Sequence, residues 1–135
     1  MASNAGIVTG KQYVRFAETL EADTAEVFEF RPVFSAGGGT YTATVAASAV
    51  GISQFYLPAL ADAPTDSRLL SVATSGLLLV EADSSTASLI TVGSALIVDA
   101  VGRASNAGTA ITIAGNTPVV REVLVGQRSF VLVAV

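Results

Sequence analysis

The sequence predicts an all-β fold: a single-domain small β-barrel or β-sandwich of short antiparallel strands, with at most one short helix. Three observations support this prediction. Ala, Val, Ser and Thr make up 67 of the 135 residues, and small and β-branched side chains suit closely packed strands. Apolar and polar residues alternate in several stretches, as they do in half-buried strands. Turn residues separate these stretches at intervals of about 8 to 12 residues, which is typical of barrels and sandwiches.

The composition favours a protein partner over nucleic acid or a membrane. The hydrophobic fraction is 51% and the charged fraction is 13%, so we expect a partner to cover part of the surface. The net charge is −4, and one Lys and six Arg leave no basic stripe, so we expect no nucleic-acid partner. No apolar run approaches the roughly 18 residues of a membrane-spanning helix, so we expect no membrane partner. The sequence contains no Cys and no visible signal peptide, which fits synthesis in a reducing cytoplasm.

The N-terminal third of the chain divides into an arm and two predicted strands. Residues 1–10 are small, polar and glycine-bearing, and we expect a flexible N-terminal arm there, followed by a single β domain at 11–135. Alternation of apolar and polar residues predicts strands at 11–20 and 25–34, separated by a turn at 21–24.

A helix is the competing interpretation of the same region. A single acidic helix from Phe16 to Phe30 would place Phe16, Leu20, Val27 and Phe30 in an apolar stripe. Strands are favoured over this helix because Phe28 and Phe30 fit poorly on one helical face.

The rest of the chain is predicted to consist of strands joined by turns. The sequence "SAGGG" at 35–39 predicts a turn, and Ser75-Gly76 predicts a break between two strands. Asp83, Ser84 or Ser85 is a candidate N-cap for a single helical turn. The remaining predicted strands are 40–47, 52–60, 68–74, 76–82, 94–100, 109–114, 118–125 and 128–135.

The five letters "ASNAG" occur twice, at 2–6 and at 104–108. The residues that follow the two copies share only a loose pattern, so we interpret the recurrence as coincidence in a chain rich in Ala, Ser and Gly. The second copy lies in a predicted hairpin connection, in which a strand ends at Asp99, Gly102 permits the turn, and the chain re-enters a strand at Thr109.

The chain offers few residues for catalysis, and we expect no enzyme activity and no cofactor. Histidine is absent, which removes the commonest general base, and a Ser–Lys dyad would require Lys11, the only lysine. Glu81 and Asp83 are two residues apart and could in principle do acid–base work, but a solvated strand end is the favoured interpretation. The acidic residues between Glu18 and Glu29 lack the spacing and the turn glycine of a calcium loop, so no metal site is predicted.

Residues 76–108, "GLLLVEADSSTASLITVGSALIVDAVGRASNAG", resemble the small decoration (cement, or head-stabilisation) proteins of tailed bacteriophages. The resembling features are a strand, a short glycine-bearing turn, a second strand and a "D-x-x-G-x-x" hairpin that matches Asp99, Gly102 and Arg103. The likeness extends over residues 45–135. The acidic, Phe-bearing first 40 residues and the long closing segment depart from the simplest members of the family.

The resemblance implies a virion structural protein that is made in the host cytoplasm, binds the outer surface of the capsid and reinforces the head. Its implied partners are the major capsid protein and further copies of itself, with a trimer favoured and a dimer possible. Arm residues could add a strand to a neighbouring sheet edge. The candidate capsid or subunit contacts are Ile7, Val8, Lys11, Tyr13, Arg103 and Asn106.

A carbohydrate- or ligand-binding β-sandwich module of a fibre or adhesin is the alternative function. Such a module needs an exposed aromatic platform. The chain has no Trp, and Tyr13, Tyr41 and Tyr56 are scattered along it, which weighs against this alternative.

Overall fold

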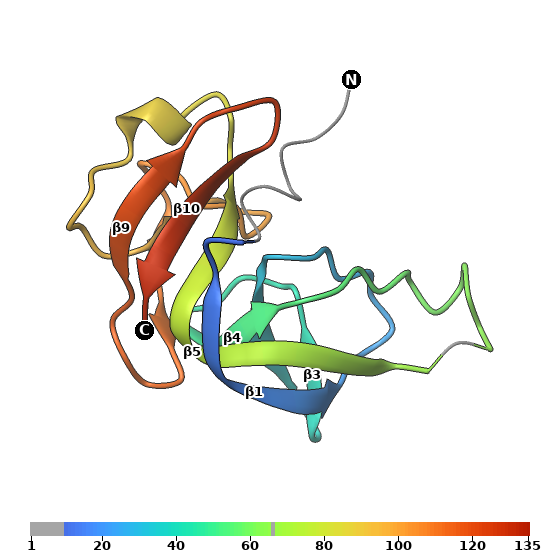
Figure 1. Cartoon of the computed structure of the whole chain (residues 1–135). Helices are drawn as coiled ribbons and strands as arrows, with labels where there is room; N and C mark the ends of the chain where they lie inside the picture. The colour runs from blue at the N-terminus through green and yellow to red at the C-terminus, as the bar shows by residue number, and fades with distance from the viewer. Residues whose placement is uncertain (1–9, 66) are drawn as a thin grey trace.

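The computed structural model describes residues 10–65 and 67–135, and it confirms the all-β class (Figure 1). A single short 3-10 helix, η1 (Ala87–Leu89), interrupts the strands of this described part. The strands are β1 (Tyr13–Glu21), β2 (Pro32–Gly37), β3 (Thr40–Thr42), β4 (Ser48–Ser53), β5 (Leu69–Ala82), β6 (Ile97–Val98), β7 (Thr109–Ala110), β8 (Thr112–Ile113), β9 (Val119–Leu124) and β10 (Ser129–Ala134).

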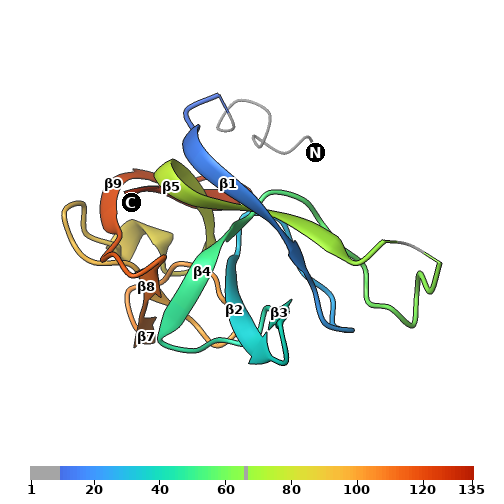
Figure 2. The same ribbon diagram turned by 90° about the horizontal axis from the view of Figure 1, so that it is seen from below.

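Most strands belong to one eight-stranded sheet in the order β3-β2-β4-β5-β10-β9, with β1 added to β5 and β8 added to β4. All pairs in this sheet are antiparallel except β4–β8, which is parallel. The 14-residue strand β5 connects the two halves of the molecule, because its first part pairs with β1 and β4 and its last part pairs with β10. Figure 2 shows β4, β2 and β3 following one another away from β1 and β5.

The first half of the sheet closes into a small ring of strands. β1 pairs with β5, β5 with β4, β4 with β2, and β2 with β3. A bridge between Ala22 and Tyr41 then joins the end of β1 to β3, with the Asp23 amide donating to the Tyr41 carbonyl oxygen at 2.8 Å. Val33, Leu70 and Val72 belong to one buried cluster that these strands share, so a hydrophobic core holds the ring together.

Two further clusters pack against β5 and β10. The larger one gathers aliphatic residues from β4, β5, β8, β9, β10 and the segment 87–111. The smaller one contains Phe30, Leu79, Phe130 and Leu132, and the rings of Phe30 and Phe130 meet edge to face with centroids 5.9 Å apart. The segment that ends at Phe30 is thereby anchored against β5 and β10.

The predicted break at Ser75-Gly76 is wrong, because β5 continues through both residues. Gly76 has a φ of +124°, and a Cβ atom there would lie 2.0 Å from the Tyr13 carbonyl oxygen. The glycine therefore allows β1 to approach β5 closely and does not end a strand.

The prediction of a strand at 25–34 is correct only from Pro32 onward, where β2 begins. Residues 25–31 form an irregular loop, which we call the Phe28 loop. Phe30 in this loop has a φ of +57°, which is incompatible with a strand. The strand at 11–20 is confirmed as β1, so the competing acidic helix is wrong.

Several other predicted boundaries shift. The strand at 40–47 is limited to β3, and the strand at 52–60 is replaced by β4 at 48–53. The stretches at 94–100 and 109–114 contain only the short strands β6, β7 and β8, whereas the strands near the C-terminus are confirmed as β9 and β10.

The predicted helical turn is confirmed as η1, although none of the proposed capping residues precedes it directly. Thr86 occupies the N-cap without a side-chain hydrogen bond. The Asp83 carboxylate instead accepts hydrogen bonds from the amide and hydroxyl of Ser85, at 3.0 and 2.8 Å.

The predicted hairpin connection is confirmed, because β6 pairs with β7. The Asp99 carboxylate accepts hydrogen bonds from the amides of Val101 and Arg103, and Gly102 has a φ of +85°. The Asp-x-x-Gly pattern is therefore a side-chain-stabilised turn.

Candidate functional site

The six residues predicted to contact a capsid or another subunit do not form one site. Ile7 and Val8, with the predicted arm apart from Gly10, lie outside the described residues. Lys11 pairs with Glu122 of β9, with 3.0 Å between the Lys11 Nζ and Glu122 Oε1 atoms. Tyr13 begins β1 and is 65% exposed.

Arg103 and Asn106 lie elsewhere, in the loop between β6 and β7. The Arg103 guanidinium is 3.1 Å from Asp99 Oδ2 and 3.8 Å from Asp83 Oδ2, so it fastens this loop to the end of β5. Asn106 is exposed beside a small hollow that also borders Leu89.

One candidate surface is β1 itself. Every residue of this nine-residue strand except Leu20 is exposed, and because successive side chains face opposite ways, both faces of the strand are uncovered. Within the described residues β5 is the only strand that pairs with Tyr13–Glu21, and the bridge to β3 begins only at Ala22, so the other edge of β1 carries unpaired backbone groups. Tyr13 and Phe16, at 65% and 63% exposure, give this edge a large apolar content. Such a surface is suited to pairing with another chain.

A second candidate surface is built on the Phe28 loop, which buried Ser53 organises. The Ser53 hydroxyl donates to the Phe28 carbonyl oxygen, lies 3.1 Å from the Arg31 carbonyl oxygen, and accepts from the Arg31 amide at 3.2 Å. The Phe30 amide donates to the Ser53 carbonyl oxygen, and the Phe30 carbonyl oxygen accepts from the Glu81 amide, both at 2.8 Å. These bonds stabilise the left-handed backbone of Phe30, so the loop turns Phe30 inward and leaves Phe28 exposed.

An exposed aromatic pair results from this arrangement. Val27 and Leu57 exchange backbone hydrogen bonds of 2.9 and 2.8 Å, which brings the Phe28 loop against the segment that follows β4. The ring centroids of Phe28 and Tyr56 are consequently 5.7 Å apart. Phe55, next to Tyr56, is 64% exposed.

The charged residues beside this pair form a chain of ion pairs. Glu81 lies between two arginines: its Oε1 atom is 3.0 Å from Arg31 Nη2, and its Oε2 atom is 3.3 Å from Arg128 Nε. Arg128 Nη1 also lies 3.1 Å from Glu29 Oε1. The side chains of Arg31 and Glu81 are only 14% and 17% exposed, so this ion pair is largely shielded from solvent and fixes the position of Arg31. Its guanidinium lies 4.6 Å from the Phe28 ring centroid.

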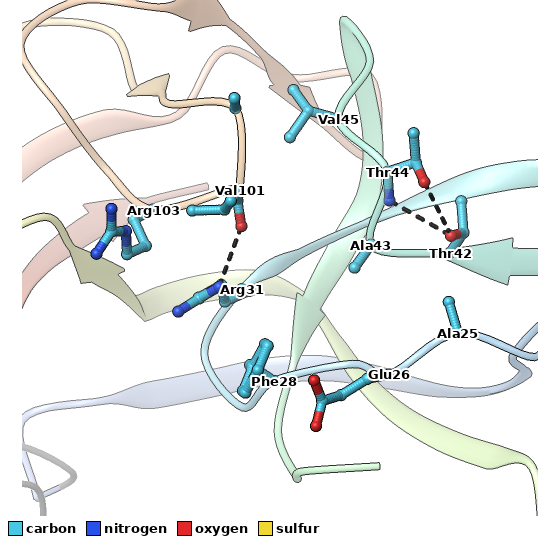
Figure 3. Close-up of a pocket in the computed structure, with 11 residues that line it drawn as sticks. Ala25, Glu26, Phe28, Arg31, Thr42, Ala43, Thr44, Val45, Val101 and Arg103 are labelled. Atoms are coloured by element: carbon cyan, nitrogen blue, oxygen red, sulfur yellow. Dashed lines mark hydrogen bonds between the residues drawn. The ribbon is translucent and has the colours of Figure 1, made fainter. Parts of the chain in front are cut away.

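Two adjoining hollows open on either side of Phe28 and Arg31. The first, of about 530 Å³, is bounded also by Glu26, by the threonines of 42–45 and by the 100–103 turn (Figure 3). The second, of about 390 Å³, is bounded also by Tyr56 and the ion-pair chain. Figure 3 shows Phe28, Glu26 and Arg31 on one side of the first hollow and Thr42 and Thr44 on another.

Two side chains near these hollows have shifted pKa values. The hydrogen bond from the Tyr56 hydroxyl to Glu26 raises the pKa of Tyr56 above its usual value of 10.0. The hydrogen bonds from the Ser85 hydroxyl and amide, together with the charge of Arg103, hold the pKa of Asp83 below its usual value of 3.8.

Several of the carboxylates singled out in the sequence contact an arginine or a hydroxyl group, and Glu29 and Glu81 share Arg128. Glu81 binds arginines, Asp83 binds Ser85, Glu26 binds Tyr56 and Glu29 binds Arg128. Across residues 10–65 and 67–135, no three His, Cys, Asp or Glu side chains are grouped so that they could hold a metal ion. The same ranges contain no helix long and apolar enough to cross a membrane.

We call the residues that line the two hollows the Phe28 surface. Only one of the six contacts predicted from the sequence, Arg103, belongs to it. The alternation in "AEVFEF" predicts a strand, and the three tyrosines are far from one another in the sequence. The signal available in the sequence was the close spacing of its aromatic residues, Phe28 with Phe30 and Phe55 with Tyr56.

No protein-family model and no curated protein matches the sequence, and no solved structure matches the fold.

Proposed function

We propose that this chain is a non-catalytic virion structural protein that binds the outer surface of a tailed-bacteriophage head and stabilises it. The observation that supports the proposal most strongly is β1, a nine-residue strand that is uncovered on both faces and unpaired along one edge within the described residues. An edge of this kind can extend the sheet of a neighbouring protein through backbone hydrogen bonds, and Tyr13 and Phe16 supply apolar contact area.

The physical logic of the proposal is mass action on a repeating lattice. A protein that binds the assembled capsid and not its free subunits stabilises the assembled state, and this stabilisation grows as its free concentration rises above its Kd. The partner in this proposal is the major capsid protein. Association of the chain with itself, as a trimer or a dimer, would add avidity without any new type of contact. Arg103, which is half-buried, and Asn106, which is exposed, are secondary candidates for contact, because they lie in a turn of the segment that resembles the family.

Co-sedimentation with undecorated heads tests this proposal. We expect the wild-type chain to sediment with heads, not to bind unassembled capsid protein, and to raise the temperature at which heads disassemble. Phe16→Ser, on β1, and Phe55→Ser, on a loop, remove rings of equal exposure, 63% and 64%. Phe16→Ser is expected to weaken binding about tenfold, and Phe55→Ser is expected to leave it unchanged. A wild-type chain that stays in the supernatant, or equal effects of the two variants, would count against the proposal.

A further inference from the structure

The two hollows beside the Phe28 loop have the size and walls of a small-ligand site. Their volumes, about 530 and 390 Å³, fall in the range of about 300 to 1,000 Å³ that is usual for such sites. Both are bounded by Phe28 and Arg31, so one extended ligand could occupy both and cross the ridge between them. No residue of β1 borders either hollow, so this surface is separate from the proposed docking strand, and of the secondary contact candidates only Arg103 lines a hollow.

The ridge presents aromatic rings that are rigidly placed. Phe28 and Tyr56 are 41% and 51% exposed, and their rings form a tilted pair. The Phe28 backbone is fixed through Ser53, and the Tyr56 hydroxyl is fixed by its hydrogen bond to Glu26. Aromatic side chains held in this way offer contact area at a low cost in conformational entropy, and they suit the apolar C–H face of a sugar ring.

The polar groups around the rings include both donors and acceptors. Arg31 Nη1 donates to the Val101 carbonyl oxygen, and Nε and Nη2 donate to Glu81, which leaves one N–H on each terminal nitrogen for a ligand. The hydroxyls of Thr42 and Thr44 lie 3.4 Å apart on the wall of the first hollow. A ligand with many hydroxyl groups, which donate and accept together, matches such a wall.

The charges of the walls balance. Arg31, Arg103 and Arg128 are accompanied by Glu26, Glu29 and Glu81, so the formal charge of the two linings is zero. Each of these arginines already contacts a carboxylate within the described chain. An anionic ligand would therefore meet no unpaired positive charge, whereas a neutral polar ligand would not disturb the ion pairs.

We propose that this surface binds a neutral oligosaccharide of at least two rings, with a ring in each hollow and the Phe28–Tyr56 pair beneath the linkage. In the sequence, the absence of Trp and the scattered tyrosines weigh against an aromatic platform for a carbohydrate. The three tyrosines are indeed scattered, but Tyr56 pairs with Phe28, and the exposed pair is an aromatic platform that does not need tryptophan.

Screening the intact chain on an array of neutral and sialylated oligosaccharides, followed by calorimetric titration of the best ligand, tests this proposal. We expect binding to neutral oligosaccharides alone. Phe28→Ala and Tyr56→Ala should each lower affinity about tenfold or more. Phe55→Ala removes a neighbouring ring that is more exposed, at 64%, but lies outside both hollows, and it should change affinity less than about twofold. Thermal unfolding of each variant distinguishes loss of the ligand site from loss of the fold.

Amide chemical shifts of the wild-type chain give a second test that needs no variant. The added oligosaccharide should shift amides of the Phe28 loop, residues 42–45 and residues 100–103. An array without binding, preference for sialylated ligands, or shifts confined to other segments would overturn the proposal. Because Phe16→Ser leaves both hollows intact, it should retain sugar binding even where lattice binding is lost, so failures of the two proposals are distinguishable.

Discussion

Replacing Ser53 by Ala tests whether one buried hydroxyl organises the Phe28 loop. Ser53 is fully buried. Its hydroxyl donates to the Phe28 carbonyl oxygen, lies 3.1 Å from the Arg31 carbonyl oxygen and accepts from the Arg31 amide at 3.2 Å. The Arg31 carbonyl oxygen keeps a hydrogen bond from the Ser53 amide, at 2.9 Å, in the variant. The Phe28 carbonyl oxygen and the Arg31 amide each lose the partner that Ser53 provides.

The expected cost follows from these two groups. A buried polar group left without a partner costs about 1 to 3 kcal/mol, and the lower end applies because the loop is partly exposed. We therefore expect Ser53→Ala to lower the free energy of unfolding by about 2 kcal/mol. With a urea slope of about 2 kcal/mol/M, the unfolding midpoint should fall by about 1 M.

Ser75→Ala is the matched control. The Ser75 hydroxyl oxygen on β5 is buried but makes no hydrogen bond within the described residues, so its removal should change stability by less than about 0.5 kcal/mol or increase it. Urea unfolding followed by far-UV circular dichroism measures both variants. Equal effects of the two substitutions, or an effect of Ser53→Ala below about 0.5 kcal/mol, would refute this account of the loop.

Two further predictions concern the backbone at Gly76 and the dependence of folding stability on pH below 3.8. Gly76→Ala should cost about 3 kcal/mol or more, because it combines a positive φ with a Cβ atom 2.0 Å from a β1 carbonyl oxygen. Gly93→Ala is the control, because Gly93 also has a positive φ, of +92°, but a Cβ atom there would lie in open space. It should cost only about 1 to 2 kcal/mol in the same urea assay. Equal costs of the two substitutions would contradict the close approach of β1 to Gly76. The lowered pKa of Asp83 means that its stabilisation is present above pH 3.8 and is lost as the pH falls through the lower, folded-state pKa. The difference in free energy of unfolding between wild type and Asp83→Asn should therefore shrink as the pH falls below 3.8. A difference that does not depend on pH would show that Ser85 and Arg103 do not stabilise the ionised Asp83 carboxylate.

The sequence was sufficient to predict the all-β class, β1, the terminal strands and the hairpin turn, because each depends on local alternation or local turn chemistry. Asp99 and Gly102 illustrate this, since the bonds that stabilise their turn lie within a few residues. Gly76 illustrates the opposite case. Its role depends on the carbonyl oxygen of Tyr13, a residue distant in sequence, so local reasoning interpreted the glycine as a break.

The Phe28 surface was unpredictable for the same physical reason. Phe28 and Phe30 alternate with polar residues as in a strand, but the hydrogen bonds of Val27 to Leu57 and of Phe28 and Phe30 to Ser53 impose a loop on this segment. Tertiary contacts thus override a local β pattern. The same contacts bring together aromatic residues that are separated in the sequence.

Amide hydrogen exchange of the chain, free and bound to assembled heads, tests most directly the central claim that β1 is a docking edge. In the free chain, the β1 amides that face away from β5 have no strand partner within the described residues and should exchange rapidly. The proposal predicts that head binding slows exchange across residues 13–21 and leaves the turn at 125–128, between β9 and β10, unchanged. A chain that binds heads with unaltered exchange in β1 would contradict the claim.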